Sequence, residues 1–163
     1  MADIYSFLAE HEIEYERYDH PPVFTVEDVN RLIPSLPGAK TKNLFLYDGK
    51  GRRHFLVSVG DEKMVDLKGL KTMLGVNRLT FCSPERLKNY LGVDPGCVSA
   101  LAIMNDRGKD VELVIDKTLW ESDAFQFHPL VNTSTLVISK AGIKHFAART
   151  DHQINIVDVP DRK

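Results

Sequence analysis

Apolar residues recur at helical spacing in several short stretches of the chain, and most of these stretches have recognisable ends. Ile4, Phe7 and Leu8 follow the i, i+3, i+4 pattern, which predicts an amphipathic helix over residues 3–11. Ser83 followed by Pro84 is typical of a helix start, with serine as the N-cap and proline in the first turn. Similar signals predict three more helix starts, at Thr25 with Asp28, at Asp66 and at Ser139, and two helix ends, at Gly75 and Gly92.

Apolar runs separated by turn residues predict strands. The runs 41–48 and 52–59 flank Asp48-Gly49-Lys50-Gly51, which is a strong hairpin signal. The runs 100–104 and 111–116 flank Asn105-Asp106-Arg107-Gly108, and we expect them to form a second hairpin. Further short strands are expected at residues 79–82, 125–128 and 135–138, while residues 15–18 look extended and residues 154–159 are either a last strand or a tail.

The order of these elements predicts the fold class. Hairpins dominate and no βαβ repeat is visible, so we expect an α+β fold whose sheet is mixed and mostly antiparallel, with flanking helices. Residues 1–163 contain no internal repeat and no Ser/Gly linker, and a chain of 163 residues fits one domain.

Composition narrows the functional classes. The net charge of −2 gives no overall basic field, so any contact with nucleic acid would have to be local. The two cysteines form no CxxC motif and have no histidine at zinc-ligand spacing, so no metal site is signalled. The amino terminus lacks the pattern of a signal peptide, and no apolar run approaches membrane-spanning length. A cytoplasmic location, with no membrane contact, is the resulting expectation.

The common catalytic signatures are absent, since the chain has no GxSxG, P-loop, GxGxxG or HExxH motif. Cys97 lies in a glycine-rich loop and is a candidate nucleophile, although no histidine is near it in sequence. Cys82 is interpreted as a small core residue. His145 and His152 are interpreted as surface or helix-packing residues, because no acidic or thiol companion stands in metal-ligand register with them.

Two segments combine buried strands with polar chemistry. Lys42 and Asn43 stand at the start of the apolar run Leu44-Phe45-Leu46, and His128 and Asn132 follow the apolar Phe127. Lys42 is open to two interpretations, a lysine that extends past a strand edge to solvent or one that contacts a phosphate or carbonyl. His128 is equally open, either a core residue or a pocket residue. Together the segments suggest a pocket with one cation, one imidazole and two amides, suited to a small charged or ester substrate.

The loop between Gly92 and Ser99 has a weaker signal. It is either a plain connector or a loop whose backbone N–H groups stabilise a substrate oxygen, since glycine permits close approach. The basic residues around the first hairpin are likewise either a solvated face or a local phosphate track: Lys40, Lys42, Lys50, Arg52 and Arg53.

Five motifs in this order resemble the YbaK/ProX family of aminoacyl-tRNA editing deacylases, and in particular its free-standing ProXp-ala (PrdX) branch. The resemblance covers about residues 3–157. The motifs are His20 to Thr25, Thr41 to Leu46, the loop from Leu91 to Ser99, Met104-Asn105-Asp106, and Phe127 to Asn132.

The resemblance implies a partly barrel-like mixed sheet and hydrolysis of the ester that joins an amino acid to the 3′-terminal adenosine of tRNA. It implies no covalent nucleophile, no metal and no cofactor, with water as the attacking group. The implied catalytic residues are Lys42, Gly96 and His128. The implied substrate-binding residues are His20, Asn43, Cys97, Val98, Ser99, Ala100 and Asn132.

The expected function is therefore trans-editing of mischarged tRNA for proline, most often with alanine, and the expected partners are the tRNA acceptor end and a prolyl-tRNA synthetase. Ala100 departs from the family, whose members usually carry proline there, and this puts the amino-acid specificity in doubt more than the reaction. Two alternatives stay open: a non-catalytic module that binds a tRNA end or a protein, and a deacylase for tRNA misacylated with cysteine or serine.

Overall fold

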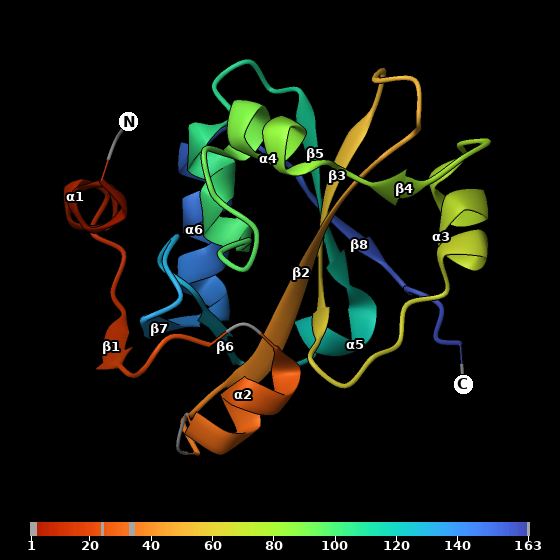
Figure 1. Cartoon of the computed structure of the whole chain (residues 1–163). Helices are drawn as coiled ribbons and strands as arrows, with labels where there is room; N and C mark the ends of the chain where they lie inside the picture. Colours follow the sequence, from red (N-terminus) through yellow and green to blue (C-terminus); the bar gives the residue numbers. More distant parts are fainter. Residues whose placement is uncertain (1–2, 24, 33–34, 163) are drawn as a thin grey trace.

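A computed structural model describes residues 3–23, 25–32 and 35–162 (Figure 1). Phe24, in the first of the five motifs, lies outside the described residues. In chain order the elements are α1 (Ile4–Glu10), β1 (Glu16–Asp19), α2 (Val26–Leu32), β2 (Ala39–Tyr47), β3 (His54–Gly60), α3 (Leu67–Leu74), β4 (Thr80–Phe81), α4 (Pro84–Leu91), the 3₁₀ helix η1 (Ala100–Asn105), β5 (Val111–Asp116), α5 (Lys117–Trp120), β6 (Ala124–Phe127), β7 (Ser134–Ser139), α6 (Lys140–Arg149) and β8 (Ile154–Val157).

The strands form one mixed sheet in the order β1-β7-β6-β2-β3-β5-β8, with β4 paired to β2. Antiparallel pairing joins β1 to β7, β6 to β7, and β2 to both β3 and β4. Parallel pairing joins β2 to β6, β3 to β5 and β5 to β8. The expected α+β class with a mixed sheet and flanking helices is confirmed.

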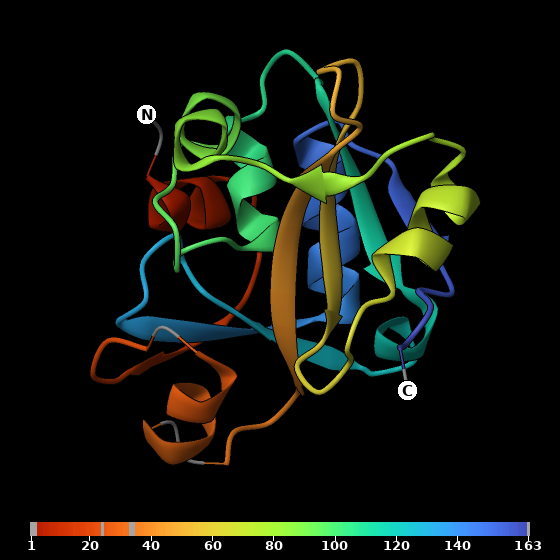
Figure 2. The ribbon, with the colours of Figure 1, turned by 45° about the vertical axis from the view of Figure 1, so that its right-hand side comes forward.

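Strand β2 is the element that the two halves of the sheet share. It pairs with β3 along most of its length but with β6 only at Ala39 and Lys40, after which β6 and β7 turn away from it (Figure 2). At its other end the same edge pairs with β4 at Leu46 and Tyr47. Within the described part of the chain, the intervening edge of β2, from Thr41 to Leu44, has no strand partner on that side. We call this stretch the open edge of β2.

The two faces of β2 lie against different cores. Phe45 belongs to the larger apolar cluster, which also contains Leu8 of α1, Leu91 of α4 and Phe146 of α6. Leu46 belongs to a second cluster on the α3 side. Because side chains alternate along a strand, each residue of β2 is assigned to one of these two sides.

The helix limits read from the sequence are confirmed. Asp66, Ser83 and Ser139 each accept a hydrogen bond from the first turn of the helix that follows. Gly75 and Gly92 end α3 and α4 in the left-handed conformation, with φ of 74° and 68°. The backbone N–H of Asp28 also donates to Thr25 Oγ1 at 3.0 Å at the start of α2.

The expected second hairpin is wrong. Residues Ala100–Asn105 form the 3₁₀ helix η1, and β5 pairs in parallel with β3 instead. Five successive residues from Ala100 to Met104 are buried, which a strand with one exposed face does not allow. A short continuous apolar run does not by itself distinguish a buried strand from a buried helical turn. The short helix α5 was also not anticipated.

Candidate active site

Three loops meet beside the amino-terminal end of η1. The backbone N–H of His20 donates to the carbonyl of Thr133 at 2.9 Å. Asn132 is bound to Val23 twice: its carbonyl accepts from the Val23 N–H at 3.2 Å, and its Nδ2 donates to the Val23 carbonyl at 3.0 Å. The backbone N–H of Asn132 faces the thiol of Cys97 and lowers its pKa, in opposition to the effect of burial. The structure therefore brings together the three motif segments that carry His20, Cys97, His128 and Asn132.

The loop before η1 begins with a tight turn. The N–H of Cys97 donates to the carbonyl of Asp94 at 3.0 Å, with Pro95 and Gly96 as the central residues. Gly96 has a φ of 87°. This is the geometry of a type II turn, in which the third residue needs a positive φ that glycine adopts without strain. Gly96 is exposed, so the turn lies at the surface of the loop.

The backbone donors after this turn are available. Among the residues that the structure describes, no hydrogen bond is formed by the N–H of Gly96 or Val98. Ser99 is fully buried, and its Oγ caps η1 by accepting from the N–H of Leu101 at 3.2 Å. A fixed turn with unused N–H groups is what an oxyanion site requires, because such donors need no rearrangement when charge develops.

Residues of the motif Met104-Asn105-Asp106 anchor this loop through hydrogen bonds. Asn105 Nδ2 donates to the carbonyl of Leu91 at 2.9 Å, at the point where α4 ends and the loop begins. The buried carboxylate of Asp106 accepts from the N–H groups of Asp110 and Val111 and from Nε2 of His152. These residues therefore fix both ends of the segment 92–105. His152, interpreted from the sequence as a packing residue, is part of this support.

His128 lies at the end of β6, and its Nδ1 is 3.3 Å from the carbonyl of Ser134. Burial lowers the pKa of His128 below the usual histidine range, and nearby His20 lowers it further, while the Ser134 carbonyl opposes the shift. A carbonyl only accepts, so the proton of the neutral ring is on Nδ1 and Nε2 is left as an acceptor. Neutral His128 can therefore accept a hydrogen bond from water.

The backbone is strained in the loop that follows His128. Leu130 has a φ of 67°, a region that a branched residue seldom occupies. Its side chain packs against the larger apolar cluster, which holds the residue in place. Strain of this kind costs of order 1–3 kcal/mol and persists where surrounding structure imposes it, often at functional sites.

Cys97 does not have the environment of a nucleophile. Burial raises the pKa of its thiol, and the nearby carboxylate of Asp94 raises it further. A reactive cysteine needs a lowered pKa, because the thiolate is the attacking species. Half-buried Cys97 instead packs beside the larger cluster, as does Val98. In Cys82, burial raises the pKa to about 12, in agreement with its interpretation as a packing residue.

Lys42 and Asn43 point to opposite sides of β2. Asn43 is on the side of Phe45, where its Oδ1 accepts a hydrogen bond from Oγ of buried Ser58. Lys42 is on the side of Leu44 and Leu46 and lies in a cavity with Leu44. No hydrogen bond or salt bridge within the described ranges joins Lys42 to Gly96 or His128. Because successive side chains of a strand alternate, Lys42 and Asn43 can contact one substrate only across the edge of β2, and a pocket that they share stays a prediction.

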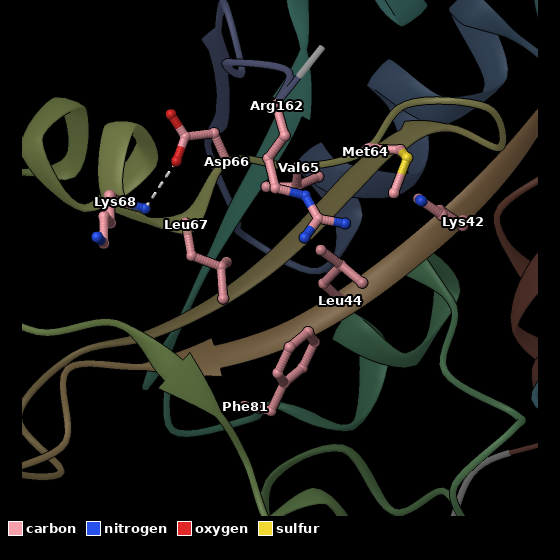
Figure 3. A pocket seen from close by; sticks show the side chains of 9 residues that line it. All are labelled: Lys42, Leu44, Met64, Val65, Asp66, Leu67, Lys68, Phe81 and Arg162. Atoms are coloured by element: carbon pink, nitrogen blue, oxygen red, sulfur yellow. Dashed lines mark hydrogen bonds between the residues drawn. The ribbon is translucent and has the colours of Figure 1, made fainter.

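The cavity that contains Lys42 has a volume of about 420 Å³, and we call it the Lys42 hollow (Figure 3). Its apolar lining comes from Leu44, Met64 and Phe81, among others, and its cations come from Lys42, Lys68 and Arg162. Burial lowers the pKa of Lys42, Asp61 opposes this, and Arg162 adds to it. The sequence did not indicate Phe81 or Arg162, which are far from Lys42 along the chain.

Two of the other basic residues of the first hairpin have partners within the protein. Lys40 donates to Asn30 at 2.9 Å, and Arg53 forms a salt bridge with Glu112 at 2.9 Å. In addition, Arg86 donates to His54 at 2.8 Å and lies 4.3 Å from the centre of the Tyr47 ring. These contacts give several of the cations a structural role.

No group of three or more His, Cys, Asp or Glu side chains is placed to hold a metal ion in the part of the chain that the structure describes. Nor does any helix there have the length and hydropathy needed to cross a membrane.

Unused backbone donors at the Gly96 turn, in a segment that meets the loop of His128 and Asn132, can stabilise the oxyanion formed when an ester is hydrolysed. The family model described as "Aminoacyl-tRNA editing domain" matches residues 20–146. The chain belongs to this family and is an aminoacyl-tRNA deacylase.

Particular relatives agree with this assignment. The chain is 38% identical over 132 residues to the prolyl-tRNA editing protein ProX of Acetoanaerobium sticklandii, covering 81% of this chain and 80% of that protein. It is 35% identical over 159 residues to prolyl-tRNA synthetase associated domain-containing protein 1 of Xenopus laevis, covering 95% and 94%. A crystal structure of a candidate trans-editing enzyme for prolyl-tRNA synthetase superposes with a TM-score of 0.70 over 98% of this chain and 95% of that one. At 15% identity, that structure supports the fold alone.

Proposed function

We propose that this protein is a trans-editing deacylase that hydrolyses mischarged tRNA for proline, with alanine as the principal amino acid removed. The observation that carries the proposal is the turn at Gly96, whose neighbouring N–H donors have no partner among the described residues, beside the loop of His128 and Asn132. Similarity to ProX, a prolyl-tRNA editing protein, supports the choice of tRNA. The whole chain acts as one editing domain in this proposal.

The reaction requires little chemistry from the protein. Water adds to the ester carbonyl, and the N–H groups of Gly96 and Val98 stabilise the oxyanion that forms. The bond from the carbonyl carbon to the ribose oxygen then breaks. The ribose oxygen leaves with a proton that derives from the water, so the products are a free amino acid and uncharged tRNA. A second hydroxyl on the terminal ribose assists this proton transfer.

His128 positions the water in this mechanism. With the proton on Nδ1 directed to Ser134, neutral Nε2 accepts a hydrogen bond from the attacking water. Cys97 and Val98 form part of the wall that contacts the amino-acid side chain. A steric clash can exclude proline from the pocket. Attractive contacts select less sharply, because they distinguish two side chains that differ by one methylene by only about 1–3 kcal/mol.

Several residues have supporting roles. Asn132 and His20 hold the loops that form the pocket, since their hydrogen bonds are made to Val23 and Thr133. Ser99 and Ala100 begin η1 and fix the direction of the preceding N–H groups. Asn43, on the same side of β2 as the larger core, orients the substrate end next to Ser58.

Lys42 contributes from the other side of the open edge of β2. Its four-carbon stem and point charge suit a phosphate of the RNA rather than the ester itself. We therefore assign Lys42 to holding the terminal nucleotide over the open edge, with the acyl group on the Gly96 side. The tRNA acceptor end is the proposed partner, and a prolyl-tRNA synthetase would supply the mischarged tRNA.

The test is the initial rate of deacylation for a panel of aminoacyl-tRNAs. The wild-type protein should hydrolyse Ala-tRNA for proline faster than the cysteinyl, seryl and correctly prolylated forms. Gly96→Ala should reduce the rate because alanine is strained at a φ of 87°. Binding of the RNA without turnover would instead identify a non-catalytic module, and a higher rate with Cys- or Ser-tRNA would change the substrate.

A further inference from the structure

The Lys42 hollow combines features that bind a nucleotide of single-stranded RNA. Phe81 lies on the two-residue strand β4 and is 57% exposed, and Met64 beside the same hollow is 40% exposed. Single exposed apolar residues are ordinary at protein surfaces. Here an exposed aromatic ring and three cationic side chains line one cavity, and such a ring is a stacking platform for a base.

The charges in the hollow favour an anion. Lys42 and Arg162 extend toward the same space from β2 and from the C-terminal tail (Figure 3). Their proximity is unfavourable, since Arg162 disfavours the charged form of Lys42, although Asp61 and Asp161 partly offset this. The carboxylate of Asp66, also in the lining, accepts from the backbone N–H of Lys68 and caps α3. A phosphate between the two cations would relieve their repulsion.

Arg162 is held in the hollow although it is close to the end of the chain. Its backbone N–H donates to the carbonyl of Met64 at 2.8 Å, and Asp161 forms a bridge with Val65. The N–H of Asp66 donates to the carbonyl of Pro160 at 2.9 Å. The tail is thus joined to the segment 64–66 by successive backbone hydrogen bonds. A side chain on a fixed backbone can position a ligand.

The open edge of β2 connects the hollow with the candidate active site. Between Thr41 and Leu44 no strand covers this edge within the described ranges, and the two sides of β2 carry Lys42 and Asn43 respectively. The half-exposed edge from Lys42 to Leu44 is where our proposal has the RNA cross β2, with its acylated end on the Asn43 side and its preceding nucleotide on the Lys42 side.

We propose that the Lys42 hollow is a binding subsite for the nucleotide that precedes the terminal adenosine, with its base stacked on Phe81 and the phosphate that joins it to the terminal adenosine between Lys42 and Arg162. This proposal rests on the proposed function, since it assigns a part of the same substrate. It concerns RNA rather than a peptide, because three cations and an exposed ring match a phosphate and a base.

The test compares a full and a truncated substrate. Phe81→Ala should raise KM for Ala-tRNA about 5- to 150-fold, the range for loss of one stacked base, and leave kcat close to wild type. With 3′-O-alanyl-adenosine, which lacks the preceding nucleotide, the same variant should match the wild type. Arg162→Gln should also raise KM for Ala-tRNA and reduce the slope of log affinity against log salt by about 0.7.

Matched controls come from exposed positions outside the hollow. Met73→Ala removes a side chain that is 52% exposed on α3, and Arg107→Gln removes an exposed cation after η1. Both should behave as wild type with both substrates. Unchanged KM for Ala-tRNA in Phe81→Ala and Arg162→Gln would overturn the proposal, and so would an equal loss with alanyl-adenosine.

A binding measurement keeps the two proposals separable. The affinity of a fluorescent ACCA tetranucleotide is measured for all variants, which needs no turnover. Weaker binding by Phe81→Ala and Arg162→Gln than by the controls supports the subsite even if the wild type hydrolyses nothing, in which case only the proposed function fails. Equal binding by all variants overturns the subsite and favours another occupant, such as an apolar peptide.

Discussion

Removal of the Asp106 carboxylate should destabilise the protein strongly, although Asp106 touches no substrate in this account. Asp106 is 4% exposed and accepts three hydrogen bonds, from the N–H of Asp110 at 3.0 Å, the N–H of Val111 at 2.8 Å and Nε2 of His152 at 2.9 Å. Asp106→Ala leaves all three donors without this partner. The methyl group of alanine offers no acceptor to the N–H groups of Asp110 and Val111.

The magnitude follows from these contacts. A buried donor that loses its partner costs roughly 1–3 kcal/mol, so three such donors would give at most about 3–9 kcal/mol, and the N–H of exposed Asp110 contributes least because water can replace its partner. Water entering the vacated space reduces the sum, and breaking one partner of a buried pair typically costs about 3–5 kcal/mol. We expect a loss of about 3–5 kcal/mol in the free energy of unfolding. Asp106→Asn should lose less, because one oxygen remains to accept.

Urea denaturation followed by circular dichroism measures this loss. Asp123→Ala is the matched control, since Asp123 is exposed and a surface change of this kind is usually within about 0.5 kcal/mol. A loss for Asp106→Ala no larger than that for Asp123→Ala would refute the reasoning. It would mean that the loop around η1 is not held by this carboxylate.

Three further predictions concern the candidate site. Ala100→Pro should raise the free energy of unfolding, measured by urea denaturation, by up to about 0.4–1 kcal/mol. The reason is that Ser99 before it is extended (φ −149°, ψ 148°) and the first position of a helical turn accepts proline. A loss above about 1 kcal/mol would contradict the assigned start of η1. Cys97→Ser should retain deacylation within about tenfold, whereas loss beyond about a thousandfold would identify a nucleophile. The pKa of His128 is lowered from the ordinary 6.5, so protonation of its ring is disfavoured in the folded protein. The deacylation rate should therefore stay level as pH falls to 6.5 and decline only below it. A decline centred above pH 6.5 in the pH–rate profile would exclude neutral His128 as the water acceptor.

Local signals in the sequence were sufficient for the helix limits and the first hairpin. Asp66 and Ser83 cap helices because their side chains accept from the next turn, which depends on neighbouring residues alone. The prediction of a strand at residues 100–104 was wrong, because burial of all these side chains removes the periodicity that distinguishes a strand from a helix. The parallel pairing of β3 with β5 depends on packing between distant segments, which a local pattern does not specify.

The candidate site was predictable in part. The motif segments of His20, Cys97, His128 and Asn132 do meet, whereas the tight turn at Gly96 was not predicted from the sequence. Alternation along β2 would already have separated Lys42 from Asn43, given that Leu44, Phe45 and Leu46 are buried on two different sides. Arg162 was beyond sequence reasoning, because its place in the Lys42 hollow depends on backbone pairing of the tail with the segment 64–66.

The most direct test of the central claim is single-turnover hydrolysis of Ala-tRNA for proline by the wild type and by Gly96→Ala at saturating protein. The claim is that water cleaves the ester without a side-chain nucleophile, because backbone donors at the Gly96 turn stabilise the oxyanion. Loss of one donor in such a site costs of order a hundred- to a thousandfold in rate, and distortion of the turn should approach that loss. The account predicts rapid hydrolysis by the wild type and a loss of this size in Gly96→Ala with folding retained. Equal rates for the two proteins would contradict it.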